Sequence, residues 1–424
     1  MKKTFMVVGG GGREHALVRV LSESPGVGEV LCTPGNASTQ RIAKCRNLPS
    51  GNNADIVRLA ASNSVDLVIP GPEVPLAAGL VDDLAAAGIP AFGPPAASAR
   101  LESSKGFAKD FMARNGVATA DYVRCQTVDE AFAALEGFGF PVVVKADGLA
   151  AGKGVLICED RSEAEAAVNS VMVAREFGTA GNQLVIEECL TGWETSVIGI
   201  VDGSTFMSFL PAKDHKRAGE GDEGPNTGGM GVIAPHPQVD KAVWNDIKGN
   251  IIDPTMAGLR AEGLEYAGFL FIGVMVTSSG AKTLEYNVRF GDPEAQALLP
   301  LLSDDLTDYI SAALEGRLKD VEPRWRGGAA CCVVLASEGY PGFYETGYPI
   351  SGISEAEAAG ARVYGAGVRS EGDNILTDGG RVLGVTGVAS NLEDARNLAY
   401  HAIEKINFKG AWYRTDVGKS SLKS

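Results

Sequence analysis

The feature that most constrains the fold is an alternation of short apolar segments and helix-like segments over the first hundred residues. Residues 4–8 form an apolar run, four glycines follow at positions 9–12, and residues 13–24 carry apolar side chains at helical spacing. The same order repeats to about residue 98, with one helix expected over 75–88. Because parallel strands need helical crossovers, the pattern predicts an open parallel α/β sheet.

From Leu101 the pattern changes to a mixture of helices and hairpin-like strands. Residues 103–117 have helical spacing, and residues 141–160 read as two strands around a glycine-rich turn. A helix is expected to begin at Ser162, because Glu165 three residues later completes a capping box. This pattern is typical of a mixed α+β region.

The length of 424 residues is too great for one ordinary core, so several domains are expected. We predict an N-terminal α/β substrate domain over 1–105 and a central two-part domain over 106–324, with a small lid subdomain at about 122–192. Short strands and glycine turns predict a β-rich C-terminal domain over 325–424.

Charge and cysteine usage exclude several classes of function. Lys plus Arg number 38 and Asp plus Glu number 53, and a net charge of −15 opposes binding to nucleic acid or to an anionic membrane. No apolar run approaches the roughly 18 residues that span a bilayer. The seven cysteines are scattered and form no C-x-x-C pair, which indicates free thiols in a reducing cytoplasm.

Three polar residues alternate in the segment LEYNVRFGDPE. Glu285, Asn287 and Arg289 lie two positions apart, so in a strand they share one face. A carboxylate, an amide oxygen and a guanidinium on one face suit a hard cation beside an anion. On this segment alone, a solvent-facing edge strand remains the alternative.

The glycines at 9–12 lie between an expected strand and an expected helix. Backbone N–H groups and the helix dipole make such a loop an anion site. The G-x-G-x-x-G fingerprint does not fit, because frames from Gly9 and Gly10 end on Glu14 and His15. A nicotinamide cofactor is therefore not expected, and a tight turn without a ligand remains the alternative.

The segment DGLAAGKGV, residues 147–155, resembles a P-loop but departs from it in spacing and in the residue after Lys153. A glycine-rich hairpin with a lysine at its tip can still close over phosphates, although a plain flexible hairpin remains open. Lys145 ends an apolar run, so its ammonium must find an anion or water. The polar loop 214–231 is long enough to be functional.

In combination, these and further segments resemble the glycinamide ribonucleotide synthetase (phosphoribosylamine–glycine ligase) family of the ATP-grasp superfamily, from end to end. The matching segments are GGREHA, PGNA, GPEVPLAAG, SKGFAKDFMARNGV, VVKADGLAAGKGV, IEE, DHKR, GPNTGGMG, EYNVRFGDPE, GYPG, GGRVLGVTG and YRTDVG. Gly10, Ser38 and Ser103 depart from residues frequent in that family, and none of these changes removes a charged group.

The resemblance implies a pre-ATP-grasp N-terminal domain, an ATP-grasp core and ATP-dependent joining of glycine to 5-phosphoribosylamine in purine biosynthesis. It implies ATP as a substrate, Mg²⁺ or Mn²⁺ as cofactor, and a monomer without a nucleic-acid or membrane partner. A different ATP-grasp ligase, a purine-pathway carboxylase and a non-catalytic nucleotide sensor remain alternatives.

The resemblance also implies roles for individual residues. Glu285 and Asn287 are expected to bind the metal, and Asp214 and Arg289 to be catalytic as well as to bind substrate. The residues expected to contact ATP are Lys105, Lys145, Gly152, Lys153, Gly154, Glu187, Glu188, Leu190 and Glu194. The remaining residues expected to bind substrate are Gly11, Gly12, Arg13, Asn36, Glu73, Asn226, Thr227, Gly228 and Gly229. His15 is expected only to pack the loop.

Overall fold

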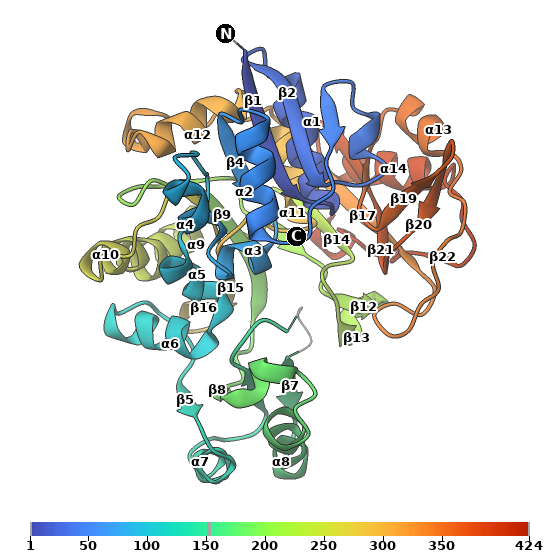
Figure 1. The fold of residues 1–424 in the computed structure, drawn as a ribbon. Helices are drawn as coiled ribbons and strands as arrows, with labels where there is room; N and C mark the ends of the chain where they lie inside the picture. The colour runs from blue at the N-terminus through green and yellow to red at the C-terminus, as the bar shows by residue number, and fades with distance from the viewer. Residues whose placement is uncertain (1, 151–153, 423–424) are drawn as a thin grey trace.

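The computed structural model describes residues 2–150 and 154–422, and these form four sheets of four or more strands and two two-stranded ribbons. Figure 1 shows the N-terminal sheet at the top of the view, the C-terminal region at its right, and a small unit of strands and helices at the bottom. The fold is the expected mixture of α/β and α+β parts.

The N-terminal sheet is wholly parallel, as predicted, with the order β3-β2-β1-β4. Its elements are β1 (Lys3–Gly9), α1 (Gly12–Glu23), β2 (Val27–Pro34), β3 (Cys45–Asn47), α2 (Asn53–Ser62), β4 (Leu67–Pro70), α3 (Glu73–Ala77) and α4 (Leu80–Ala86). The single helix expected over 75–88 is wrong. Gly79 has φ +84°, a left-handed conformation that ends α3 before α4 begins.

A second, antiparallel sheet has the order β10-β9-β15-β16 and carries the polar strand singled out above. Its strands are β9 (Trp193–Val201), β10 (Phe206–Ser208), β15 (Gly268–Thr277) and β16 (Gly280–Asn287). The helices of this region are α5 (Ala96–Ser103), α6 (Lys105–Arg114), α9 (Lys241–Ile247), α10 (Asp253–Ala261), α11 (Glu294–Leu301) and α12 (Leu306–Leu314).

The unit at the bottom of Figure 1 is an antiparallel sheet with the order β5-β8-β6-β7. It consists of β5 (Tyr122–Cys125), α7 (Val128–Leu135), β6 (Val142–Ala146), β7 (Val155–Cys158), α8 (Arg161–Val168) and β8 (Leu184–Glu188). The cap expected at Ser162 is wrong, because the Asp160 carboxylate accepts the Glu163 N–H at 2.9 Å and α8 begins one residue earlier. Aspartate is as good a cap as serine, so two candidates competed within one turn.

The C-terminal sheet takes in two strands from far upstream. Its order is β11-β14-β17-β21-β18, with β22 also on β17. Its elements are β11 (Lys213–Asp214), β14 (Gly231–Ala234), β17 (Ala329–Ser337), α13 (Ile353–Ala358), β18 (Arg362–Gly365), β21 (Arg381–Ala389), α14 (Leu392–Ile403) and β22 (Ala411–Trp412). The loop that joins β11 to β14 is therefore fastened to the C-terminal sheet at both ends, and it contains the ribbon β12 (Arg217–Gly219) and β13 (Glu223–Asn226).

One hydrophobic cluster joins the N-terminal sheet to the second sheet. Phe290, just beyond β16, packs on Phe269 of β15 with ring centroids 4.7 Å apart, and Phe5 of β1 belongs to the same cluster. Removal of these aromatic surfaces from water fixes the end of β16 against the N-terminal domain. The β5–β8 unit has a separate cluster that includes Val144 and Ile186.

The seven cysteines are free, as the sequence predicted. None of the helices in residues 2–150 and 154–422 combines the length and the apolar character needed to cross a bilayer.

The packing of α14 on β21 yields a stability prediction. A Cβ atom at Gly387 would overlap the Ala395 carbonyl oxygen and lie 2.8 Å from the Ala399 nitrogen. We expect Gly387→Ala to lower the free energy of unfolding by roughly 1 to 3 kcal/mol, because a packed interface must open to admit the methyl group. Gly249→Ala is the matched control, since a methyl group there would meet no atom of another segment within 4 Å. Urea denaturation of both variants measures the difference, and equal stabilities would contradict the prediction.

Candidate active site

The two faces of the β16 strand end differ as predicted. Tyr286, Val288 and Phe290 are each at most 2% exposed and lie in hydrophobic clusters. Glu285, Asn287 and Arg289 are half-buried and belong to a polar network. The alternative of a solvent-facing edge is therefore wrong for this segment.

Arg289 is held between two carboxylates from the N-terminal part of the chain. Its Nε atom lies 3.3 Å from Glu73 Oε2 and its Nη2 atom lies 3.0 Å from Glu102 Oε1. The same Nη2 donates to Asn287 Oδ1 at 3.0 Å. Burial alone would lower the pKa of Arg289, but Glu102 and Glu73 raise it, so the guanidinium stays charged.

Glu285 lies in a strongly positive environment. Burial opposes its ionisation, yet Lys216, Lys105 and Lys145 lower its pKa below the usual value. The carboxylate is thus ionised although it is withdrawn from water. Burial lowers the pKa of Lys105. Among the charged neighbours that oppose this effect, Glu285 has the largest influence.

The oxygen donors at the end of β16 fit a divalent cation whose coordination is completed by a bound ligand. No group of three or more His, Cys, Asp or Glu side chains in the described part of the chain could form a protein cage for a metal. Glu285 and Asn287 nevertheless present two oxygen donors on one face. Mg²⁺ is commonly bound by one or two protein oxygens together with phosphate oxygens and water, so these residues fit it.

Glu187 is shared by two lysines. Its Oε2 atom lies 2.9 Å from Lys145 Nζ and 3.1 Å from Lys109 Nζ, and all three side chains are less than 10% exposed. The group carries a net positive charge if both lysines are protonated. Burial lowers the pKa of Lys109 to about 8, although Glu187 partly restores it. The single negative charge of Glu187 cannot neutralise two ammonium groups, so the excess positive charge is available to an anion.

The structure describes most of the other residues expected to contact ATP. Glu188 pairs with Lys282 at 2.5 Å, and Glu194 pairs with Lys216 at 2.6 Å. Leu190 follows the end of β8. Gly152 and Lys153 lie outside the described residues. Gly154 immediately precedes β7, and its carbonyl accepts the Ala146 N–H at 2.9 Å.

The N-terminal loop is bound to the segment after β16 through Arg13. The Arg13 N–H donates to Asp292 Oδ2 at 3.2 Å, and its Nη1 donates to the Phe290 carbonyl at 3.1 Å. The glycines are required by the chain itself, because a Cβ at Gly10 would lie 2.6 Å from the Gly35 carbonyl oxygen. A Cβ at Gly12 would overlap the Gln296 amide. Protein packing therefore accounts for part of the glycine run.

Asn36 and His15 form hydrogen bonds with backbone groups of the protein. Asn36 Nδ2 donates to the carbonyls of Gly10 and Gly365, each at 2.8 Å. His15 Nδ1 accepts the Gly365 N–H at 2.8 Å, and burial lowers its pKa to about 3. The prediction that His15 packs the loop is confirmed.

Asp214, at the start of the loop 214–229, is influenced by the charges of Glu294, Lys216 and Arg381. Asp214 Oδ1 is buried and has no hydrogen-bond partner among the described residues. Burial and the nearby Glu294 raise the pKa of Asp214 well above its usual value. Such a carboxyl group takes up a proton more readily than an exposed aspartate and can accept a hydrogen bond from an amine.

Thr227 organises the glycines that follow it. Its hydroxyl donates to the Lys216 carbonyl at 2.8 Å and accepts the Gly229 N–H at 3.0 Å. Arg381 Nη1 donates to the Gly228 carbonyl and, at 2.8 Å, to that of Asp292. The predicted residues Asn226 to Gly229 are thereby tied to the segment after β16.

The structure adds charged residues that the sequence interpretation missed. They share burial and direct contact with predicted site residues, and they are Glu102, Lys109, Lys216, Asp292, Glu294 and Arg381. For Lys216 a signal was present, because it lies two residues after Asp214. Glu102 gave no signal, since it becomes a partner of Arg289 only through the tertiary fold.

Family models match three consecutive parts of the chain. They are described as the N domain, the ATP-grasp (A) domain and the C domain of phosphoribosylglycinamide synthetase, and they match residues 3–102, 103–295 and 330–420. An Allochromatium vinosum protein named phosphoribosylamine–glycine ligase is 47% identical over 421 residues, which cover 99% of this chain and 98% of the relative. The chain belongs to the phosphoribosylglycinamide synthetase family.

Solved structures agree with this membership. A phosphoribosylamine–glycine ligase from Thermotoga maritima superposes with a TM-score of 0.86 at 33% identity, covering 97% of this chain and 99% of that one. A biotin carboxylase domain from Hydrogenobacter thermophilus, solved with MgADP and bicarbonate, superposes with a TM-score of 0.74 at 17% identity over 100% and 98% of the two chains. The second likeness concerns the fold alone.

The charge of Glu285 yields a prediction for this family member. Glu285→Gln keeps the shape and removes the charge, so we expect a rate loss of roughly 10²-fold or more in ADP formation. Asn287→Ala removes an oxygen that water can partly replace, and its loss should be smaller. Added Mg²⁺ should recover some activity in both variants. A folded Glu285→Gln protein with normal rates and an unchanged Mg²⁺ dependence would exclude metal binding by Glu285.

The burial of Glu102 yields a pH prediction. Burial raises its pKa to about 7, although Arg289 opposes the rise. Between the unfolded value of about 4.5 and this folded value the native state holds the extra proton, so rising pH removes stability. Relative to Glu102→Gln, the wild type should lose roughly 2 kcal/mol of unfolding free energy from pH 5 to pH 7. Urea denaturation at each pH measures this, and parallel curves would contradict it.

Proposed function

We propose that this chain catalyses the ATP-dependent ligation of glycine to 5-phosphoribosylamine, giving glycinamide ribonucleotide, ADP and phosphate in purine biosynthesis. The observation that carries the proposal is the end-to-end similarity to the phosphoribosylamine–glycine ligase of A. vinosum. The charged groups that such a reaction needs are present around β16: an anion-binding arginine, several lysines and a pair of oxygen donors for a cation.

In the first step, a glycine carboxylate oxygen bonds to the γ-phosphorus of ATP, the bond to the β-bridging oxygen breaks, and ADP leaves. Among the described residues, Arg289 already donates to Glu73, Glu102, Asn287 and the Phe290 carbonyl, which leaves one N–H of its Nη1 atom. That N–H is suited to donate a charge-assisted hydrogen bond to the glycine carboxylate. Lys105 and Lys145 would contact the phosphates and offset their charge. A divalent cation at Glu285 and Asn287, when bound, would neutralise further phosphate charge.

In the second step, the amine of phosphoribosylamine bonds to the acyl carbon of glycyl phosphate, the carbon–oxygen bond to phosphate breaks, and the nitrogen loses a proton. We assign the uptake of this proton to Asp214. Its raised pKa suits a general base, and its Oδ1 atom has no partner among the residues that the structure describes.

The remaining substrate contacts are proposed from the similarity to the family. We propose that Gly11, Gly12, Arg13, Asn36 and Glu73 bind phosphoribosylamine from the N-terminal side. Asn226, Thr227, Gly228 and Gly229 would bind substrate from the opposite side.

The nucleotide would lie along β8. We propose that Glu188 and Leu190 contact adenine and that Glu187 or Glu194 contacts the ribose. Gly152, Lys153 and Gly154 are also proposed to contact ATP. Mg²⁺, or Mn²⁺ in its place, would be the cation. We further propose a monomer in the cytoplasm, a reducing compartment that suits seven free thiols.

The main alternative is another ATP-grasp carboxylate–amine ligase or carboxylase, and amino-acid specificity separates the two. We expect glycine to support ADP release in the presence of phosphoribosylamine and Mg²⁺, and alanine or serine to support far less. A coupled assay with freshly prepared phosphoribosylamine measures the rates, with reactions lacking phosphoribosylamine as controls. Comparable kcat/KM values for glycine and alanine would overturn the assignment.

A further inference from the structure

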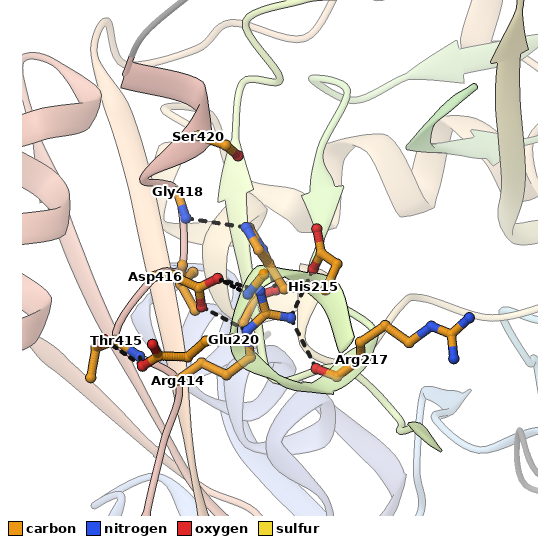
Figure 2. Close-up of polar contacts among 12 residues, drawn as sticks. His215, Arg217, Glu220, Arg414, Thr415, Asp416, Gly418 and Ser420 are labelled. Carbon is orange, nitrogen blue, oxygen red and sulfur yellow. Dashed lines mark hydrogen bonds and ion pairs between the residues drawn. The ribbon is translucent and has the colours of Figure 1, made fainter. Parts of the chain in front are cut away.

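The C-terminal segment Arg414–Ser420, which we call the clasp, crosses the loop formed by residues 215–224 (Figure 2). The clasp comes from the last described part of the chain, whereas the loop lies almost two hundred residues upstream. Bonds between the two segments are made by Arg414, Thr415, Asp416 and Gly418. The mechanism proposed above assigns no role to the clasp.

Arg414 is the centre of this contact. Its side chain is 1% exposed. It pairs with both oxygens of Asp416, at 2.8 Å each, and its Nη1 donates to the Arg217 carbonyl at 2.9 Å and to Asp222 Oδ1 at 2.8 Å. Only a planar fork with several donors can serve these acceptors together, so lysine cannot replace it.

Neighbouring residues extend the contact along the loop. The Thr415 hydroxyl donates to Glu220 at 2.5 Å, and the Gly221 N–H donates to Asp416 Oδ2 at 2.8 Å. Asp222 lies at φ +60°, a left-handed conformation that a non-glycine residue adopts only when other contacts hold it. The clasp supplies those contacts.

His215 fixes the other end of the loop. Its Nε2 atom accepts the Gly418 N–H at 3.1 Å, and Nδ1 lies 3.2 Å from the Gly231 carbonyl. These partners require a neutral ring with the proton on Nδ1. Burial, reinforced by Arg414, lowers the pKa of His215 to about 4, so the ring is neutral at physiological pH.

Lys216 lies between the two residues that the clasp holds. Its neighbour His215 bonds to Gly418, and the carbonyl of its other neighbour, Arg217, bonds to Arg414. The Lys216 ammonium donates to Glu194 Oε2, at 2.6 Å. It is also the largest favourable charge on Glu285. Fixing the backbone on both sides of Lys216 therefore fixes a charge beside the proposed metal ligand.

We propose that Arg414 is a positioning residue that acts through the 215–224 loop to hold Lys216 against Glu194 and Glu285 during catalysis. This inference rests on the proposed ligase function. It implies that the C-terminal domain completes the reaction site through the backbone of the loop rather than by touching substrate with the clasp.

The test is a double-mutant cycle in glycine-dependent ADP formation. We expect Arg414→Lys to lower kcat roughly 10-fold, because a small displacement of a positioned charge is costly. In a Lys216→Met background the same change should cost less than about 2-fold, since its effect passes through Lys216. Equal losses in both backgrounds would overturn the proposal, as would a folded Arg414→Lys enzyme with normal kcat.

A milder variant protects the test against misfolding. Thr415→Val removes the bond to Glu220 at the loop tip, and we expect it to show the same dependence on Lys216 with a smaller loss. Arg369→Met is the control, because Arg369 forms an exposed ion pair with Glu371 in the same domain and lies outside the clasp–loop contact. Thermal melts report folding. If the wild type itself lacks glycine-dependent turnover, the proposed function fails; if the wild type turns over and both clasp variants match it, only this inference fails.

Discussion

The buried ion pairs of Arg289 connect the parts of this protein. The guanidinium belongs to the segment after β16, whereas Glu73 begins α3 and Glu102 lies in α5. Each of the three charges would be costly to bury alone, so the N-terminal domain and the second sheet must stay together for any of them to be satisfied. One N–H of the same arginine, on Nη1, is used neither by these carboxylates nor by Asn287 or the Phe290 carbonyl, so an anionic substrate can join it there.

Charge balance explains why the acidic chain can still bind polyanions. The net charge is −15, yet Lys105, Lys145 and Lys216 all act on the single carboxylate of Glu285. Three lysines around this one carboxylate concentrate positive charge in a poorly solvated place, where it acts strongly on phosphates, although Lys145 also pairs with Glu187 and Lys216 with Glu194. The surrounding acidic surface has no such effect, because water and salt screen exposed charges.

The sequence was sufficient wherever a local rule decides the structure. Period-two alternation predicted the two faces of β16, and the alternation of strands and helices predicted the parallel sheet. The helix predictions failed at Ser162, where Asp160 was an equally good cap, and at Gly79, which splits an expected helix. Sequence patterns could not identify Glu102 or Arg381, because their contacts join residues 186 and 153 positions apart. Long-range partners of this kind leave no periodic signal.

The separate core of the β5–β8 unit gives its polar contacts a particular importance. The buried residues of that cluster all come from the unit itself, so polar contacts with α6 contribute to its attachment. The Glu187 carboxylate, at the end of β8, reaches Lys109 on α6, and Lys145 of β6 shares the same oxygen atom. Lys109 is therefore the lysine of this group through which Glu187 holds the unit to α6. If a nucleotide binds here as proposed, its phosphates would compete with Glu187 for the ammonium of Lys109, which would couple nucleotide binding to the way this unit is held.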